Sequence, residues 1–244
     1  MANYVTTRMI VTGGKEEISR FREAFFVYDP INEEGDPYNY HFDFNRIIPM
    51  PKAIEDTFES SYPVHGVELL LYLAYQNELL KPQIDNGIFT TCTPIGIRMA
   101  TGIPYEPLED VVREYLRIKP DVKEDGEKSL KALAETGYLS WFGWSVENWG
   151  TRRNPSCTCL QYDEEERLEF LFETEWSFPK PIIMKASSMF PTLDITVLYY
   201  DEGGDFAGQG SLGPNGVGLM ECHGDEIPEK LYEQVYGVKP PGIS

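Results

Sequence analysis

Residues 168–176 alternate apolar and acidic side chains with a period of two. Leu168, Phe170, Phe172 and Trp176 share one face, and Glu169, Glu173 and Glu175 share the other. This period is typical of a β-strand with one face on a core and the other toward water. Cys157 and Cys159 show the same period before a charged turn at 163–167. The sequence therefore predicts a β-hairpin with one apolar face and one acidic face.

Further strands and helices are predicted on both sides of this hairpin. Residues 4–11 alternate as a strand, and residues 18–26 carry apolar side chains at helical spacing. After the hairpin, residues 177–190 form a helix with prolines in its first turn, and residues 193–199 alternate again. The order strand, helix, insertion, strand, strand, helix, strand contains two split β-α-β units. It predicts an α+β fold, the ferredoxin-like sandwich, with a large and mostly helical insertion after the first helix.

The segments outside these units divide the chain into parts. We expect a single domain over residues 1–244, with a ferredoxin-like core from 1–28 and 150–202, a helical insertion over 29–149, and a C-terminal hairpin and helix over 203–244. Within the insertion, helices are predicted over 66–80, 105–117 and 127–148. The insertion is also rich in proline, aspartate and tyrosine.

Four tryptophans lie between residues 141 and 176, in and before the predicted β-hairpin. We expect Trp141, Trp144, Trp149 and Trp176 to pack between the insertion and the sheet. A buried indole removes a large apolar area from water while its N–H finds an acceptor. Replacement of Trp149 or Trp176 by alanine should then destabilise the fold strongly.

The chain carries a strong negative charge. It has 21 Lys and Arg against 40 Asp and Glu, a formal net charge of −19. Such a field repels nucleic-acid phosphates and favours basic partners, and it also keeps ordinary proteins soluble. The longest apolar stretch, 66–75, is too short to cross a bilayer, and the N-terminus lacks a signal-peptide pattern. We expect a cytoplasmic protein with no membrane partner and four reduced cysteines.

Metal and cofactor sites are not indicated by the residue pattern. The one group of candidate ligands is Cys157 and Cys159 together with Cys222 and His223, and its spacing is not that of a zinc knuckle. We expect no metal and no cofactor. The sequence does not indicate an oligomeric state.

Several segments resemble a known family. They are Phe42–Pro51, Glu147–Thr151, Phe172–Pro179, Phe190–Leu193 and Tyr199–Tyr200. In combination they resemble the YubB ferredoxin-like family, which is carried by conjugative plasmids, phages and bacterial genomic islands. The chain departs from the family's pattern at Arg152–Asn154 and at Phe178. The resemblance implies a ferredoxin-like fold and a mobile-element setting, and it brings no reaction or catalytic residue.

The expected function is that of a non-enzymatic accessory protein of a phage or plasmid. It would bind a macromolecular partner, such as a basic host or defence protein, through an acidic surface that could mimic nucleic-acid charge. The candidate binding residues are Glu169, Glu173, Glu175, Asp201, Glu202 and Asp205.

Two alternatives remain open. A ferredoxin-like module could bind nucleic acid through Trp149, Arg152 and Arg153, although we expect no direct nucleic-acid contact from so acidic a chain. An enzyme of unknown reaction would show a concave pocket that holds carboxylates close to tyrosine or histidine.

Overall fold

The computed structural model describes residues 3–29, 39–58, 66–67, 69–70, 113 and 116–240. The chain divides into two compact units, residues 1–49 with 145–244, and residues 50–144. The expectation of a single domain stays a prediction.

The first unit is built on an antiparallel sheet with the strand order β4-β5-β1-β6-β7-β8. The strands are β1 (Tyr4–Thr12), β4 (Ser156–Asp163), β5 (Arg167–Glu175), β6 (Asp194–Asp201), β7 (Phe206–Leu212) and β8 (Gly218–His223). Helix α1 (Lys15–Phe25) follows β1, and helix α9 (Lys180–Met189) follows β5. Strands β4, β5, β1 and β6 with these two helices form the two split β-α-β units. The ferredoxin-like α+β prediction is confirmed.

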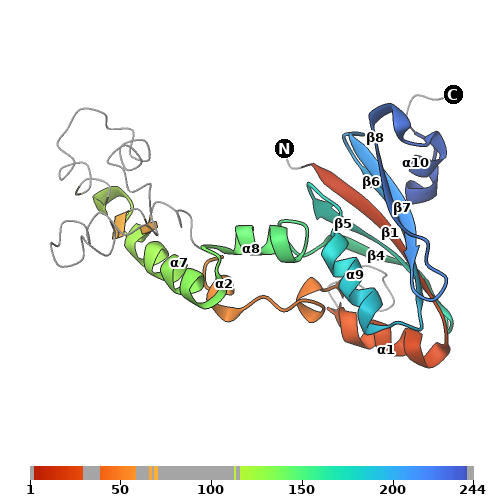
Figure 1. Cartoon of the computed structure of the whole chain (residues 1–244), viewed down its shortest axis with the longest axis horizontal. Coiled ribbons are helices and arrows are strands. Elements are labelled where there is room, and N and C mark those ends of the chain that lie inside the picture. Colours follow the sequence, from red (N-terminus) through yellow and green to blue (C-terminus); the bar gives the residue numbers. More distant parts are fainter. Residues whose placement is uncertain are drawn as a thin grey trace. The chain divides into compact units, whose positions relative to one another are not determined.

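The two faces of this sheet are covered differently (Figure 1). Helices α1 and α9 lie on one face, where Phe170 and Phe172 of β5 are fully buried. Helix α10 (Glu229–Tyr236) packs on the other face, where its Leu231 and Val235 contact Ala207 of β7. The predicted hairpin and helix after residue 203 are therefore present, as β7, β8 and α10. The face that was expected to meet water is partly covered by α10.

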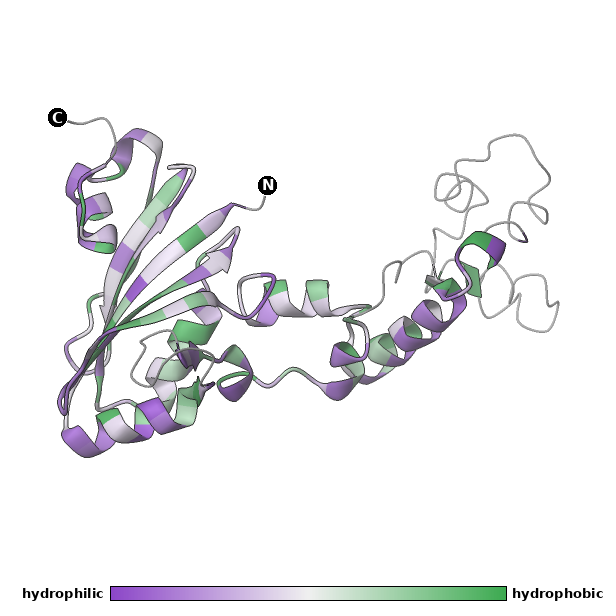
Figure 2. Cartoon of the chain, turned by 180° about the vertical axis from the view of Figure 1, so that it is seen from behind, coloured by the Kyte–Doolittle hydropathy of each residue, from purple (hydrophilic) through white to green (hydrophobic). Residues whose placement is uncertain are grey.

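Aromatic rings form the centre of the core. A two-stranded ribbon of β2 (Phe26–Tyr28) and β3 (Tyr40–Phe42) brings Phe42 to 5.0 Å from Phe170, between ring centroids. Trp149 is 2% exposed, and its indole N–H donates to the carbonyl oxygen of Ile48 at 2.9 Å. The strands alternate hydrophobic and hydrophilic residues along their length (Figure 2). The burial expected for Trp149 is confirmed.

The second unit contains α2 (Lys52–Glu55), α7 (Val122–Thr136) and the start of α8 (Trp141–Asn148). The single helix predicted over 127–148 is wrong, because Gly137 adopts a φ of 84° and ends α7 with a hydrogen bond to Leu133. Left-handed glycine is a common helix stop. The helices predicted over 66–80 and 105–117 lie almost entirely outside the described residues. Among the helices that are described, none has the length and apolar character needed to cross a bilayer.

Candidate functional site

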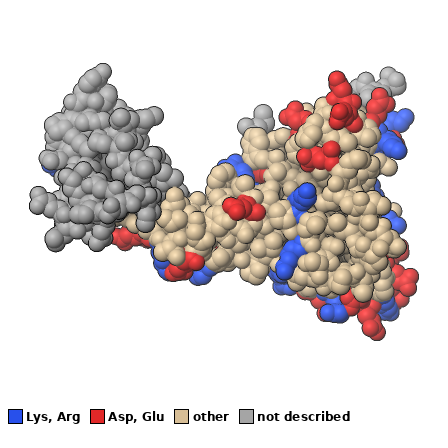
Figure 3. All heavy atoms as spheres, viewed as in Figure 1, with Lys and Arg blue, Asp and Glu red and all other residues tan. Residues whose placement is uncertain are grey.

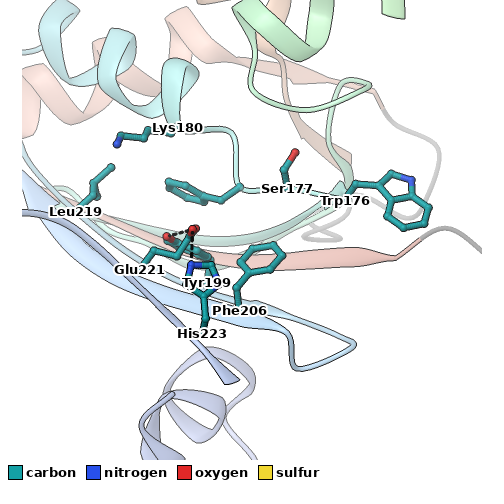
Figure 4. Close-up of a pocket in the computed structure, with 9 residues that line it drawn as sticks. Trp176, Ser177, Lys180, Tyr199, Phe206, Leu219, Glu221 and His223 are labelled. Atoms are coloured by element: carbon teal, nitrogen blue, oxygen red, sulfur yellow. Dashed lines mark hydrogen bonds and ion pairs between the residues drawn. The ribbon is translucent and has the colours of Figure 1, made fainter. Parts of the chain in front are cut away.

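A pocket lies on the helix-side face of the sheet, where β6, β7 and β8 extend beyond α9 (Figure 4). We name it the aromatic pocket, and its volume is about 350 Å³. Its lining residues are Trp176, Ser177, Phe178, Lys180, Tyr199, Phe206, Leu219, Glu221 and His223. The strand register explains how β-strand residues meet here: Tyr199 pairs with Gly208, which pairs with Glu221, and Phe206 pairs with His223. Paired residues point to the same face of a sheet.

Tyr199 forms the floor of the aromatic pocket. Its ring stacks on Phe178 with centroids 4.0 Å apart and an interplanar angle of 9°. On its other side it lies against the backbone at Gly208, where a Cβ atom would come within 2.2 Å of the ring. A larger residue at 208 would displace the ring. The phenol is therefore held between Phe178 and the β7 backbone.

The Tyr199 hydroxyl orients a carboxylate. It donates a hydrogen bond to Glu221 Oε2 at 2.9 Å. Burial, this hydrogen bond and the negative charge of Glu221 raise the pKa of Tyr199 well above its ordinary value. The phenol thus remains a protonated donor. The other carboxylate oxygen, Oε1, lies 3.4 Å from Nε2 of the exposed His223.

Trp176 lies at the rim of the aromatic pocket, where it has an unusual backbone conformation and a large exposed side chain. It has a φ of 68°, in the left-handed region that bulky residues avoid, and it is 47% exposed. Its backbone N–H donates to the carbonyl oxygen of Asn3 at 2.8 Å, which fixes the chain as it leaves β5. The burial expected for Trp176 is wrong, because the positive φ turns its side chain out of the alternation that β5 follows.

The opposite end of the aromatic pocket carries a positive charge. Lys180 is the first residue of α9, and its side chain is exposed. Figure 4 shows Lys180 and Trp176 at opposite ends, with Glu221 and Tyr199 between them. Ser177 faces the same space, and its hydroxyl donates to the carbonyl oxygen of Gly150 at 2.6 Å. A ligand at the Trp176 end would meet aromatic rings and a carboxylate before it met the lysine.

Acidic residues surround this end of the sheet. Strands β5, β6 and β8 end here, and β1 and β7 begin here. The pairing of Tyr4 with Glu175 and of Phe206 with His223 shows that these strand ends lie at the same end of the sheet. The acidic rim, as we name it, consists of Glu175, Glu202, Asp205, Asp225 and Glu226. Glu175 is partly exposed and the other four are exposed. Figure 3 shows acidic side chains gathered in this part of the molecule, over the strand ends and α10.

Glu169, one of the predicted binding residues, is not available to a partner. Glu169 is fully buried, where its carboxylate accepts hydrogen bonds from Arg8 Nε at 2.7 Å and from Arg167 at 2.5 Å. Arg8 also donates to the carbonyl oxygen of Gln234 in α10. The expectation of a solvated acidic face at Glu169 is wrong, because two arginines neutralise this carboxylate and α10 packs nearby.

Asp201 has a structural role instead of a surface role. It is fully buried, accepts a hydrogen bond from the Asn3 side chain, and accepts another from the Asp205 backbone N–H at 3.1 Å. These bonds fix the turn between β6 and β7 and tie it to the start of β1. The partly exposed Glu173 lies beside Cys157, where burial and the charge of Glu173 raise the thiol pKa.

The residues proposed for nucleic-acid binding do not form an aromatic and basic surface. Trp149 belongs to the core and cannot stack on a base. Arg152 is partly buried, and Arg153 is exposed. A stacking platform requires an accessible ring, so this candidate site loses its aromatic member.

The candidate metal ligands lie far apart. Cys159 belongs to β4 and Cys222 to β8, and these strands are the two opposite edges of the sheet. Sheet neighbours lie about 4.8 Å apart, so the two edges cannot supply ligands to one ion. Within the described residues, no group of three or more His, Cys, Asp and Glu side chains is placed to hold a metal. Cys92 lies outside the described residues.

Sequence reasoning missed the contact between Tyr199 and Glu221 that builds the aromatic pocket. Tyr199 falls in the segment 193–199 predicted as a strand, and the sequence pattern does not single out Glu221. One signal could have found them: Gly208 and Gly210 fall at alternate positions of a strand, so this face carries no side chain between Phe206 and Leu212. Such a face leaves room for a ring or a ligand to approach the backbone.

Comparison with known proteins supports the fold. Residues 158–235 match the family described as "Ferredoxin-like domain in Api92-like protein". The crystal structure of the protein Api92 from Yersinia pseudotuberculosis aligns with 93% of this chain and 100% of that chain, at 11% identity and a TM-score of 0.42. No curated protein sequence matches the chain. The matched segment is thus similar to a ferredoxin-like domain of Api92-like proteins, and it contains every residue that lines the aromatic pocket.

Proposed function

We propose that this chain is a non-enzymatic binding protein that recognises a basic macromolecular partner, a protein with a positively charged surface. The observation that carries the proposal is the acidic rim at the end of the sheet where the exposed Trp176 and the aromatic pocket also lie. Tryptophan and tyrosine are enriched among residues that dominate binding energy at protein interfaces. Acidic residues near such an anchor steer a basic partner toward it and disfavour acidic ones.

The charge of the whole chain supports the same partner. A formal net charge of −19 creates a field that repels nucleic-acid phosphates at long range. The resemblance to the YubB ferredoxin-like family supports a setting on a phage or plasmid. There, an acidic cytoplasmic protein could occupy the nucleic-acid-binding surface of a host or defence protein.

A second candidate function rests on one specific contact. Glu221 lies between the Tyr199 hydroxyl and the His223 ring in a concave pocket, which is the arrangement expected of an enzyme with an acidic site. Two features favour binding over catalysis. The phenol is held protonated as a donor to Glu221, and the 3.4 Å separation from His223 exceeds the usual length of a hydrogen bond.

The test uses the full chain and labelled peptides of defined charge at about 0.15 M salt, where surface charges are screened beyond about 8 Å. Fluorescence anisotropy should show binding of basic peptides, and none of an acidic peptide or of duplex DNA. Two variants with equal charge change locate the surface. The rim variant is Glu175→Gln with Glu202→Gln and Asp205→Asn, and the control is Glu164→Gln with Glu165→Gln and Glu166→Gln.

The rim variant should weaken binding, and the control variant should leave affinity almost unchanged. The control residues lie in the β4–β5 turn, at the opposite end of the sheet from the acidic rim. Equal weakening by both variants would show a nonspecific charge effect and contradict the proposal. Tighter binding of DNA than of basic peptides would contradict it as well.

A further inference from the structure

We infer that the aromatic pocket accepts an arginine side chain, with the guanidinium against Glu221 and Phe206 and with Trp176 at the rim. This inference rests on the proposed function and names the group of the basic partner that enters the pocket. The chemistry needed is a fixed carboxylate, aromatic faces beside it, and a negative surrounding field. The structure supplies each of these separately.

The carboxylate is fixed before any ligand arrives. Glu221 Oε2 accepts the hydrogen bond from Tyr199, whose ring is itself held between Phe178 and the backbone at Gly208. An ionised carboxylate has about four acceptor positions, so the bond from tyrosine and the His223 nitrogen 3.4 Å from Oε1 leave room for a fork of two N–H donors. Arginine presents such a fork, whereas lysine presents a point charge. A fixed carboxylate therefore favours arginine.

Aromatic faces are available beside this carboxylate. Phe206 lies 6.5 Å from Tyr199 between ring centroids, and 6.4 Å from His223. Figure 4 shows Phe206 between Glu221 and Trp176, and the Trp176 ring at the outer rim, pointing away from Glu221. A planar guanidinium stacks on aromatic faces and is attracted by their negative quadrupole, most strongly by that of tryptophan.

The backbone at Trp176 provides a second, independent observation. An aromatic residue with a positive φ is strained, and strain of this kind persists where surrounding structure enforces it and clusters at ligand sites. The strain here displays an indole to solvent instead of burying it, which adds no core stability. A binding role explains why a tryptophan occupies a position that glycine would fill without strain.

Substitution of Lys180 distinguishes a cationic ligand from an anionic one. A bound guanidinium would feel repulsion from this ammonium at the other end of the pocket, so Lys180→Gln should tighten arginine binding by about twofold. An anionic ligand would instead use Lys180 as its partner. The same substitution would then weaken binding, and the inference would be overturned.

The experiment is an NMR titration of the full chain with the tripeptides Gly-Arg-Gly, Gly-Lys-Gly and Gly-citrulline-Gly. Citrulline has the shape of arginine without its charge. Gly-Arg-Gly should shift the indole N–H resonance of Trp176 in a saturable way, with affinity above that of the lysine peptide, and the citrulline peptide should cause no shift. Equal affinity for citrulline and arginine would overturn the inference.

Two variants connect the effect to the pocket. Glu221→Gln keeps an acceptor for Tyr199 but removes the charge, and it should weaken binding of Gly-Arg-Gly by about tenfold. Trp176→Ala should weaken it by about threefold, followed on the Phe206 resonances. Thermal melts establish that each variant is folded. Unchanged affinity in folded Glu221→Gln would overturn the inference.

The failure of this inference can be told apart from failure of the proposed function. If longer basic peptides bind the wild type and Glu221→Gln equally but bind the rim variant weakly, the proposed function stands and the arginine pocket does not. If the wild type binds no basic peptide, both fail. Loss of binding in Glu221→Gln and in the rim variant supports both.

Discussion

The same face of the sheet is a sealed core at one side and an open pocket at the other. Under α1 and α9, strand β5 buries Phe170 and Phe172 completely. Beyond α9, strand β7 presents Gly208 and Gly210 on that face, and β8 presents the exposed Glu221. Two helices cover the strands of the split β-α-β units, and the added strands β7 and β8 extend past them. In the part of the chain that the structure describes, the pocket is thus a consequence of widening the sheet with β7 and β8, which α1 and α9 do not cover.

Two tryptophans show this contrast most clearly. Trp149 is sealed in the core with its indole N–H bonded to Ile48, whereas Trp176 is held half-exposed at the rim of the aromatic pocket. Trp149 stabilises the fold because its burial removes a large apolar area from water. Trp176 has a strained backbone and an exposed ring, so its contribution must lie elsewhere. Substitutions at both positions test whether the two regions have separate roles.

The largest expected effect is in the sealed region. Trp149→Ala should lower the free energy of unfolding by about 3–5 kcal/mol, because it leaves a large cavity and an unpaired Ile48 carbonyl. Urea denaturation followed by circular dichroism measures the change. A loss below about 1 kcal/mol would show that this tryptophan does not hold the core together.

The sealed region could be predicted from the sequence, and much of the open region could not. Period-two alternation identified the buried phenylalanines of β5, and the order of strands and helices gave the ferredoxin-like topology. These are local signals. The burial of Glu169 depends on Arg8, which lies on another strand, and on α10, so no local pattern reveals it.

Two further differences have the same kind of cause. Gly137 interrupts an apolar pattern that continues across it, and only its left-handed φ shows that α7 ends there. Alternation assigned Trp176 to the buried face, but β5 ends at Glu175 and the next residue adopts a positive φ. A pattern with a period of two holds only while the backbone stays extended.

An intermediate effect is expected where the two regions meet, at Tyr199. Its folded pKa lies above its unfolded value of about 10, so above pH 10 the folded state keeps a proton that the unfolded state loses. The stability contributed by this phenol is therefore complete below pH 10 and decreases at higher pH. Relative to Tyr199→Phe, the wild type should lose about 1.4 kcal/mol per pH unit above 10.

Denaturation of both proteins from pH 8 to pH 11 measures this difference. Tyr162→Phe, at an exposed position of β4, serves as the reference for removal of a surface phenol. Below pH 10, Tyr199→Phe should be less stable by about 1 kcal/mol, since it lacks the hydrogen bond to Glu221. A constant difference between wild type and Tyr199→Phe across the whole pH range would contradict the burial of this hydroxyl and its bond to Glu221.

The smallest expected effect on stability is at Trp176. The informative quantity is the sign of the stability difference between Trp176→Gly and Trp176→Ala. Trp176→Ala should change the free energy of unfolding by less than about 1 kcal/mol, because the ring is half-exposed while alanine keeps the unfavourable φ. Trp176→Gly should be more stable than Trp176→Ala by about 1 kcal/mol, because glycine adopts a positive φ without a steric penalty. At a strand end with an ordinary extended backbone, the glycine variant would be the less stable one. If glycine instead proved less stable than alanine, the left-handed backbone at 176 would not be a feature of the folded protein, and the strained display of the indole would no longer support a binding role.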